Sequence, residues 1–328
     1  AAAFAIVGAL YAVFGGLRAV AVSDTYSGVL LLAMAILVVF LALNAIDYDF
    51  SGIPAERLTL ISDNDSPIPW HTLLTGMIFI KMFYWGTNQV ITQRAMAAPS
   101  ISEAQKSVFA AAGIRFMIVP AIIVIPGIVS YKLYGDIGDA AYGTIVFDML
   151  FDWLRGVFAA AMAAAVLTTF NSNLNSATAL YVCDVHESYT NDKPNVPVLS
   201  GFVTILITAL SLVLVQVYAQ AESIINLIQQ LYGLLSMPIL SVFILGLVFK
   251  NVHAHAGIFS VVLGVALYAL LSFEGSPRHA PFGLHFIHLM FITLISCVGL
   301  SLLLNWLVYK QKPVFTLAAL KGPVAEAK

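Results

Sequence analysis

Hydroxyl-bearing residues recur along one apolar stretch of the sequence, after a run of alanines. Counting from Ala165, they are Thr168, Thr169, Ser172 and Ser176, at spacings of three and four. Residues at these spacings share one face of a helix. Because hard cations prefer oxygen ligands, two adjacent hydroxyls and a backbone carbonyl could form part of a Na⁺ site. The alternative is hydrogen bonding between helices, a common use of Ser and Thr in membranes.

A second stretch combines aromatic rings, a glycine and amides. Tyr84 and a tryptophan precede Gly86, and the amides Asn88 and Gln89 follow it. Glycine permits local unwinding of a helix, and amides can satisfy the freed backbone groups. Discontinuous helices of this kind form solute sites in many secondary transporters. An aromatic ring beside amides suits a sugar, which has apolar C–H faces and many hydroxyls; the alternative is an aromatic belt at the membrane interface.

Three ionisable side chains belong to otherwise apolar stretches. Lys81 and Arg115 each lie well within one, and Asp24 begins another after the Gly15-Gly16 pair. A charge at membrane depth costs at least about 2.5–3.5 kcal/mol unless it is paired or hydrated, so it indicates a functional site. Lys81 and Arg115 could instead snorkel to an interface. Asp24 could cap a helix N-terminus or bind a cation.

A further polar stretch lies later in the chain. The amides Asn226, Gln229 and Gln230 precede Gly233 and Pro238. This stretch is too polar for a lipid-facing surface, and its glycine and proline permit a break in the helix.

The histidines indicate no metal site. His285 and His288 are spaced i, i+3, and His253 and His255 lie in a loop. Neither pair has an accompanying carboxylate or third ligand of the kind that zinc sites use. The sequence therefore predicts no metal ion other than Na⁺.

The composition places these residues in a membrane protein. The chain of 328 residues is 60% hydrophobic and 10% charged, with a mean hydropathy of +0.93, whereas soluble domains carry about 25% charged residues. There is no basic tract, so no nucleic-acid partner is expected. We predict an all-α polytopic membrane protein whose partner is the lipid bilayer, with residues 1–328 as a single transmembrane transporter domain. A span needs about 20 mostly apolar residues, and the candidate spans are about 3–18, 24–46, 70–92, 106–131, 153–183, 196–218, 223–249, 255–273 and 284–308.

The distribution of Lys and Arg predicts the orientation. If the turn at Gly15-Gly16 is cytoplasmic, most loop Lys and Arg residues lie inside, as the positive-inside rule requires. The tail 309–328 is then cytoplasmic, in a multi-pass protein of the cell membrane. The chain begins within an apolar stretch and without Met, so we expect a fragment that starts inside a helix.

Three motifs resemble the solute:sodium symporter family, and they follow one another at fitting distances over nearly the whole chain. They are Tyr11-Ala-Val-Phe-Gly-Gly-Leu-Arg-Ala-Val-Ala-Val-Ser-Asp24, Tyr84-Trp-Gly-Thr-Asn-Gln-Val-Ile-Thr-Gln-Arg94 and Thr168-Thr-Phe-Asn-Ser-Asn-Leu-Asn-Ser-Ala-Thr-Ala-Leu-Tyr-Val-Cys-Asp184. The second motif is most similar to the sodium/glucose and sodium/galactose branch. The resemblance implies a five-plus-five inverted-repeat core with alternating access. This chain would supply core helices 4–10 and two peripheral helices, and it would lack the N-terminal helices one to three.

The same resemblance implies roles for individual residues. The family's conserved sodium site would use the Ala165 carbonyl and the Thr168 and Thr169 hydroxyls, with Thr in place of the Ser usual in the sugar branch. Asp24 matches an acidic position linked to a further cation site. Tyr84 matches an aromatic residue that stacks on the sugar and blocks the inward path. Gln229 matches a sugar-binding amide.

Three positions depart from the sugar branch. Arg115 stands where a sugar-binding Lys is expected, Lys81 replaces an Asn or Ser, and Ile225 replaces an aromatic outer gate. Arginine offers a planar fork suited to carboxylates. The substrate could therefore be an acidic sugar, such as a sialic or uronic acid.

The sequence thus predicts Na⁺-coupled symport of a sugar or sugar-like solute, with Na⁺ as coupling ion, no cofactor and no enzymatic activity. A membrane-embedded enzyme would need a metal or an acid–base cluster. A channel, a membrane-embedded sensor, or a relative that moves proline, pantothenate or iodide are the remaining alternatives. We expect this fragment alone to transport nothing.

Overall fold

The computed structural model describes residues 2–59, 61, 68–191, 193–219, 224–273 and 284–316. Their regular secondary structure is helical apart from one pair of short strands, and they form two compact units. Unit 1 comprises Ala1–Leu60 and Gln93–Ala219, and unit 2 comprises Ile61–Thr92 and Gln220–Lys328. The side chains of Ile225 and Asn226, and residues 317–328 of the expected tail, lie outside the described part of the chain.

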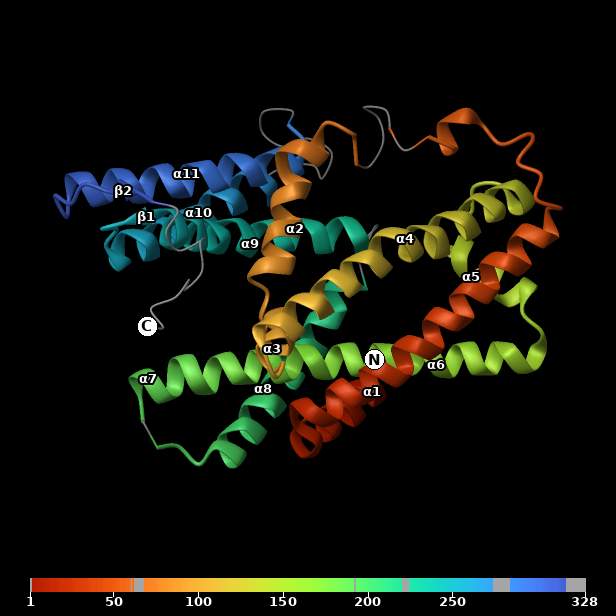
Figure 1. The fold of residues 1–328 in the computed structure, drawn as a ribbon, viewed down its shortest axis with the longest axis horizontal. Coiled ribbons are helices and arrows are strands. Elements are labelled where there is room, and N and C mark those ends of the chain that lie inside the picture. Colours follow the sequence, from red (N-terminus) through yellow and green to blue (C-terminus); the bar gives the residue numbers. More distant parts are fainter. Residues whose placement is uncertain are drawn as a thin grey trace. The chain divides into compact units, whose positions relative to one another are not determined.

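Unit 1 is built from long helices joined by short connections (Figure 1). Its helices are α1 (Ala2–Ala45), α4 (Ile101–Tyr134), α5 (Ala141–Met149), α6 (Asp152–Ala179), α7 (Glu187–Tyr189) and α8 (Val196–Tyr218); α3 (Gln89–Met96) begins in unit 2 and ends in unit 1. Its core includes Met34 and Val38 of α1, Val129 of α4, Ile145 of α5 and Phe158 of α6. Burial of these side chains packs α1 against α6 and α4.

The helix α1 is interrupted at Gly16, where the expected spans 3–18 and 24–46 meet. Gly16 has φ 59° and ψ −174°, a backbone conformation that essentially only glycine adopts. The Tyr11 hydroxyl lies 2.8 Å from the Ala19 carbonyl oxygen and 3.1 Å from the Ser23 hydroxyl. These contacts join the two halves of α1 across the turn.

Two ion pairs hold the loop after α1 to the end of α4. The Lys132 ammonium lies 3.0 Å from the Asp49 carboxylate, and the Arg57 guanidinium lies 2.7 Å from that of Asp136. Hydrogen bonds from Ser51, and secondarily Lys132, lower the pKa of Asp49. The hydrogen bond from Arg57 lowers the pKa of Asp136.

Unit 2 contains three long helices that lie side by side in Figure 1 and contact one another. Its elements are α2 (Ile78–Gly86), α9 (Ile224–Val248), β1 (Phe249–Lys250), α10 (Ala254–Phe273), α11 (Phe286–Leu307) and β2 (Val314–Phe315). The strands pair antiparallel, with Phe249 opposite Phe315. Met237, Tyr268, Ile287 and Met290 form part of the buried core.

The helix α9 continues through Gly233 and Pro238, so the break that the sequence allowed there does not occur. The glycine serves packing instead. A Cβ atom at Gly233 would lie 2.3 Å from the Tyr268 hydroxyl, and one at Gly264 of α10 would lie 2.1 Å from the Cys297 sulfur of α11. Both glycines therefore allow close approach between neighbouring helices.

The expected span 70–92 is discontinuous. A π-helical segment, Leu73–Met77, leads into α2, which ends at Gly86; Thr87 and Asn88 then separate it from α3. The helix is therefore broken at the position where the sequence predicted that glycine would allow unwinding.

Seven helices within the described residues are long and apolar enough to cross a membrane. They are Arg18–Ala45, Ile101–Tyr134, Asp152–Tyr189, Val196–Gln216, Leu227–Val248, Ala254–Ser272 and Phe286–Leu307, and Ala2–Gly16 is a shorter apolar helix. The predicted all-α polytopic membrane fold is confirmed.

Candidate cation and solute sites

One face of α6 brings hydroxyl oxygens against α1. Thr168 is 6% exposed; its hydroxyl donates to the Ala165 carbonyl at 3.2 Å and lies 3.5 Å from the Ser27 hydroxyl of α1. The Ser172 hydroxyl donates to the Thr168 carbonyl at 2.7 Å. Ala165, Thr168 and Ser172 therefore form a row of oxygens inside unit 1.

Thr169 does not belong to this row. Its side chain is exposed, whereas those of Thr168, Ser172 and Ser176 are buried. Consecutive residues of an α-helix differ by about 100° in direction, so Thr168 and Thr169 cannot both face α1. Thr169 therefore lies at the exposed edge of the face that its spacing predicted, and its role as a sodium ligand stays a prediction.

Asp24 belongs to an ion-paired network that joins α1, α3 and α6. Its Oδ2 lies 2.5 Å from the Arg94 guanidinium and 3.1 Å from the Ser172 hydroxyl oxygen. Arg94 also donates to the Ser172 hydroxyl. One turn along α6, the Ser176 hydroxyl donates to Oε1 of Gln93 at 3.0 Å. The side chains of Arg94 and Asp24 are 31% and 29% exposed, so their charges are partly removed from solvent.

Sequence reasoning assigned Arg94 no role in the site. The signal that could have identified it is electrostatic: a carboxylate in a membrane span requires a compensating charge. Arg94 closes the same motif as Tyr84, and it is this basic residue that the fold brings to Asp24.

A cavity of about 460 Å³ lies beside Thr168, between the two halves of α1 and α6. Asn171, 2% exposed, lines it, and its Oδ1 has no hydrogen-bond partner in the described part of the chain. Tyr26 and Ser27 of α1 line the opposite side. The candidate cation residue Thr168 is therefore next to a space that is mostly apolar but has a few oxygen atoms.

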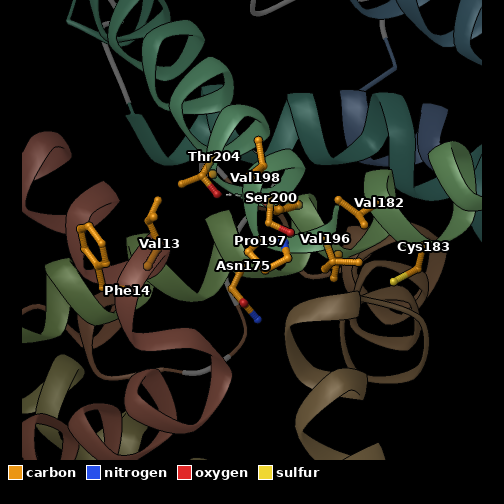
Figure 2. A pocket seen from close by; sticks show the side chains of 14 residues that line it. Val13, Phe14, Asn175, Val182, Cys183, Val196, Pro197, Val198, Ser200 and Thr204 are labelled. Atoms are coloured by element: carbon orange, nitrogen blue, oxygen red, sulfur yellow. Dashed lines mark hydrogen bonds between the residues drawn. The ribbon is translucent and has the colours of Figure 1, made fainter. Parts of the chain in front are cut away.

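A second cavity of unit 1, of about 480 Å³, lies between the first half of α1, the end of α6 and α8 (Figure 2). Figure 2 shows Asn175, Ser200 and Thr204 at its wall, together with Val13 and Phe14. None of the predicted cation-binding or solute-binding residues lines it. It is therefore distinct from the candidate cation site.

Most predicted solute-binding residues belong to unit 2. Tyr84 is half-buried and packs edge-on against Trp85, with ring centroids 5.8 Å apart. Gln229 on α9 is half-buried, and its amide nitrogen lies 3.7 Å from the Met77 sulfur. Lys81 on α2 is exposed. Unit 2 therefore places an aromatic ring, an amide and an ammonium on or beside its broken helix.

Two other predicted residues lie at or beyond the helix break, and Arg115 is separate. Asn88 Oδ1 accepts from the Val90 backbone N–H at 2.9 Å, so this oxygen caps α3. Gln89 is half-buried at the start of α3. Arg115 is an exposed residue of α4 in unit 1.

Comparison with known proteins gives one consistent result. A profile described as the sodium:solute symporter family matches residues 2–264. The chain is 30% identical to "Uncharacterized symporter YidK" of Escherichia coli, over 94% of this chain and 55% of that protein. It is also 30% identical to the "Sodium/glucose cotransporter" of Vibrio parahaemolyticus, over 92% of this chain and 61% of that protein. The chain thus spans a little over half the length of these relatives.

A structural comparison supports the same fold. The chain resembles a solved structure titled as the substrate-bound outward-open state of a Na⁺-coupled sialic acid symporter. The TM-score is 0.75 at 19% identity, and the match covers 95% of this chain and 67% of the other.

Proposed function

Because the chain belongs to the sodium:solute symporter family, we propose that its full-length protein carries out Na⁺-coupled symport of a sugar or sugar-like solute by alternating access. The observation that carries this proposal is the buried row of oxygens on α6 beside the Asp24 carboxylate. Cation binding would favour one conformation of the transporter, and solute binding would shift the population further.

The first cation position uses the Ala165 carbonyl and the Thr168 hydroxyl. These oxygens lie 3.2 Å apart, a spacing that lets both approach one ion at about 2.3–2.6 Å, as oxygen ligands do around Ca²⁺. Thr169 is exposed beside them, so it would join the site only if the ion lies at the outer edge of α6. The bound ion would replace the hydroxyl proton as the partner of the carbonyl.

The second cation position uses Asp24. Its carboxylate is already compensated by Arg94 and Ser172. A cation that binds this carboxylate must either share it with the Arg94 guanidinium or displace that group. Because Arg94 belongs to α3, directly beyond the helix break, displacement would release a contact between α3 and α1.

The solute position uses Tyr84, Gln229 and the remaining amide groups near the break. An aromatic ring can stack on the apolar face of a sugar, and amides can bond its hydroxyls. Asn88 keeps its NH₂ group for such a bond, since its Oδ1 caps α3, and Gln89 follows it on α3.

An acidic sugar is the second candidate, and the cations Lys81 and Arg115 favour it. Arginine can bind a carboxylate through two parallel hydrogen bonds. The structural relative is described as a sialic acid symporter. We therefore include sialic acid among the solutes to be tested.

The topology that accompanies this function is a single transporter domain over 1–328 in the cell membrane, with a cytoplasmic C-terminus. The Lys and Arg distribution supports this orientation.

Uptake into proteoliposomes tests the proposal. The full-length protein would be given labelled galactose, glucose or sialic acid, with and without an inward Na⁺ gradient. We expect the gradient to drive accumulation, and Thr168→Ala to reduce it at least about tenfold, the effect of losing a bond worth about 1.5–3 kcal/mol to a charged group. Thr208→Ala is the control, because that buried hydroxyl donates to the Thr204 carbonyl of its own helix. Uptake that does not depend on the Na⁺ gradient, or an equal loss of uptake in Thr168→Ala and Thr208→Ala, would contradict the proposal.

A further inference from the structure

Two histidines that are 217 residues apart in the sequence meet in unit 2. His71 precedes the π-helical segment, His288 lies on the first turn of α11, and His71 Nδ1 is 2.9 Å from His288 Nε2. The ring planes differ by 6° and the centroids are 4.9 Å apart. Because the nitrogens are much closer together than the centroids, the two rings meet nitrogen edge to nitrogen edge.

A threonine orients one of these rings. The Thr75 hydroxyl lies 2.6 Å from His288 Nδ1. If Nδ1 carries the proton and donates to Thr75, then Nε2 accepts a hydrogen bond from His71 Nδ1–H. Metal-binding histidines usually donate their other ring N–H to an oxygen, and this fixes the tautomer and the ring orientation.

The backbone holds the pair in place from both sides. Gly76 packs so closely on α11 that a Cβ atom there would lie 2.2 Å from the Ile287 carbonyl oxygen. Thr72 is fully buried and donates to the Pro69 carbonyl at 2.7 Å. The π-helical segment and α11 are thus in contact next to His71 and His288, whose rings are themselves only half-buried and can be reached by an ion.

We propose that His71 Nδ1 and His288 Nε2 bind a borderline transition-metal ion, for which Zn²⁺ is the probe. Zn–N bonds of about 2.0–2.1 Å in tetrahedral geometry separate two ligand nitrogens by about 3.3 Å, so the pair would open by a few tenths of an ångström as the ion replaces the hydrogen bond between the rings. His71 would then shift its Nδ1 proton to Nε2 or release it to solvent. Across the described residues, no cluster of three or more His, Cys, Asp or Glu could hold a metal. Water would therefore fill the remaining positions, and the site is of modest affinity.

Such an ion would bridge the segment that leads into α2 and the first turn of α11. Because α2 ends at the helix break and carries Tyr84, the bridge would restrain the helix that we assign to solute binding. Inhibition of uptake by Zn²⁺ rests on the proposed function, whereas Zn²⁺ binding does not.

Competition with a fluorescent zinc chelator tests binding on the purified full-length protein. His71→Asn and His288→Gln place an amide nitrogen near each lost ring nitrogen, so they keep hydrogen bonding but not metal affinity. We expect Thr75→Val to weaken Zn²⁺ binding about tenfold, as loss of an orienting group does, and each histidine variant to weaken it further. His253→Asn is the control, because His253 Nδ1 already accepts from the His255 backbone N–H.

The outcomes separate the two ideas. Zn²⁺ binding that is lost in the histidine variants and kept in the control supports the site, whether or not uptake responds. Zn²⁺ binding equal in all variants, or no binding under conditions where the wild-type protein is folded by its melting curve, would overturn it. A control titration with Mg²⁺ should show no competition, since Mg²⁺ prefers oxygen ligands.

Discussion

The two units use the same residue types in different ways. In unit 1, Ser and Thr side chains bond to other helices: Ser172 to Asp24 and Arg94, and Thr178 to Thr204 at 3.1 Å. These contacts join α6 to α1, α3 and α8.

In unit 2, three buried hydroxyls bond to their own helices. Ser241 donates to the Pro238 carbonyl, Ser260 to that of Ala256, and Thr293 to that of Leu289. Close approach between these helices occurs at small residues such as Gly264.

The difference shows that residue type alone does not reveal the function of a hydroxyl in a membrane helix. A hydroxyl that donates to a carbonyl of its own helix does not use that hydrogen bond to join neighbouring helices. A hydroxyl that contacts the same carboxylate as a guanidinium can give up this contact when a cation binds the carboxylate. We therefore expect the stability of unit 1 to be sensitive to the loss of a charge, and that of unit 2 to be sensitive to a change of side-chain volume.

Removing the charge of Arg94 should give the largest effect. Arg94→Ala leaves Asp24 without its cation, and we expect the protein to lose about 2–3 kcal/mol of stability, between the values for exposed and fully buried ion pairs. Thermal or denaturant unfolding in detergent measures this. Arg57→Ala breaks the surface pair with Asp136 and should cost less than about 1 kcal/mol. Adding Asp24→Asn to Arg94→Ala should recover part of the lost stability, because the uncompensated carboxylate is removed. Equal losses of stability in Arg94→Ala and Arg57→Ala would contradict the difference between the two ion pairs.

A volume change in unit 2 should have the next largest effect. Gly264→Ala places a methyl group 2.1 Å from the Cys297 sulfur, so we expect a loss of about 1–3 kcal/mol by overpacking. Gly299→Ala on α11 meets nothing within 4 Å and should be neutral or slightly stabilising. Cys297→Ala removes the obstructing atom and should rescue Gly264→Ala in melting experiments. Failure of this rescue would show that the close approach does not depend on that atom.

The smallest effect is expected when a single hydroxyl is removed, and it can be compared between the two units. Ser172→Ala removes bonds to Asp24 and Arg94 and should cost about 1–2 kcal/mol, while Ser241→Ala removes one bond within a helix and should cost about 0.5 kcal/mol or less. Repeating the melts over a series of NaCl concentrations, with choline as the matched cation, sharpens the test. Only Ser172→Ala should change the dependence on Na⁺, and a similar change in Ser241→Ala would contradict the comparison.

Part of the candidate site could be predicted because it depends on local order along the chain. The spacing from Ala165 to Ser176 predicted a common helical face, and Thr168, Ser172 and Ser176 lie on it. The same spacing could not show that Thr169 points elsewhere, since helical periodicity gives a face about 100° wide but not its centre. The contact between Thr168 and Ser27 shows which part of this face lies against α1.

The sequence by itself determined the class of this protein. Its apolar content requires lipid around the helices, and helices satisfy their own backbone groups. It also determined the turn at Gly16 and the break at Gly86, because both depend on the freedom of one residue. Only the tertiary structure decided that Arg94 pairs with Asp24, that Gly233 serves packing rather than a break, and that His71 meets His288. Each of these depends on two segments far apart in the chain, and their proximity is set by the packing of the helices between them.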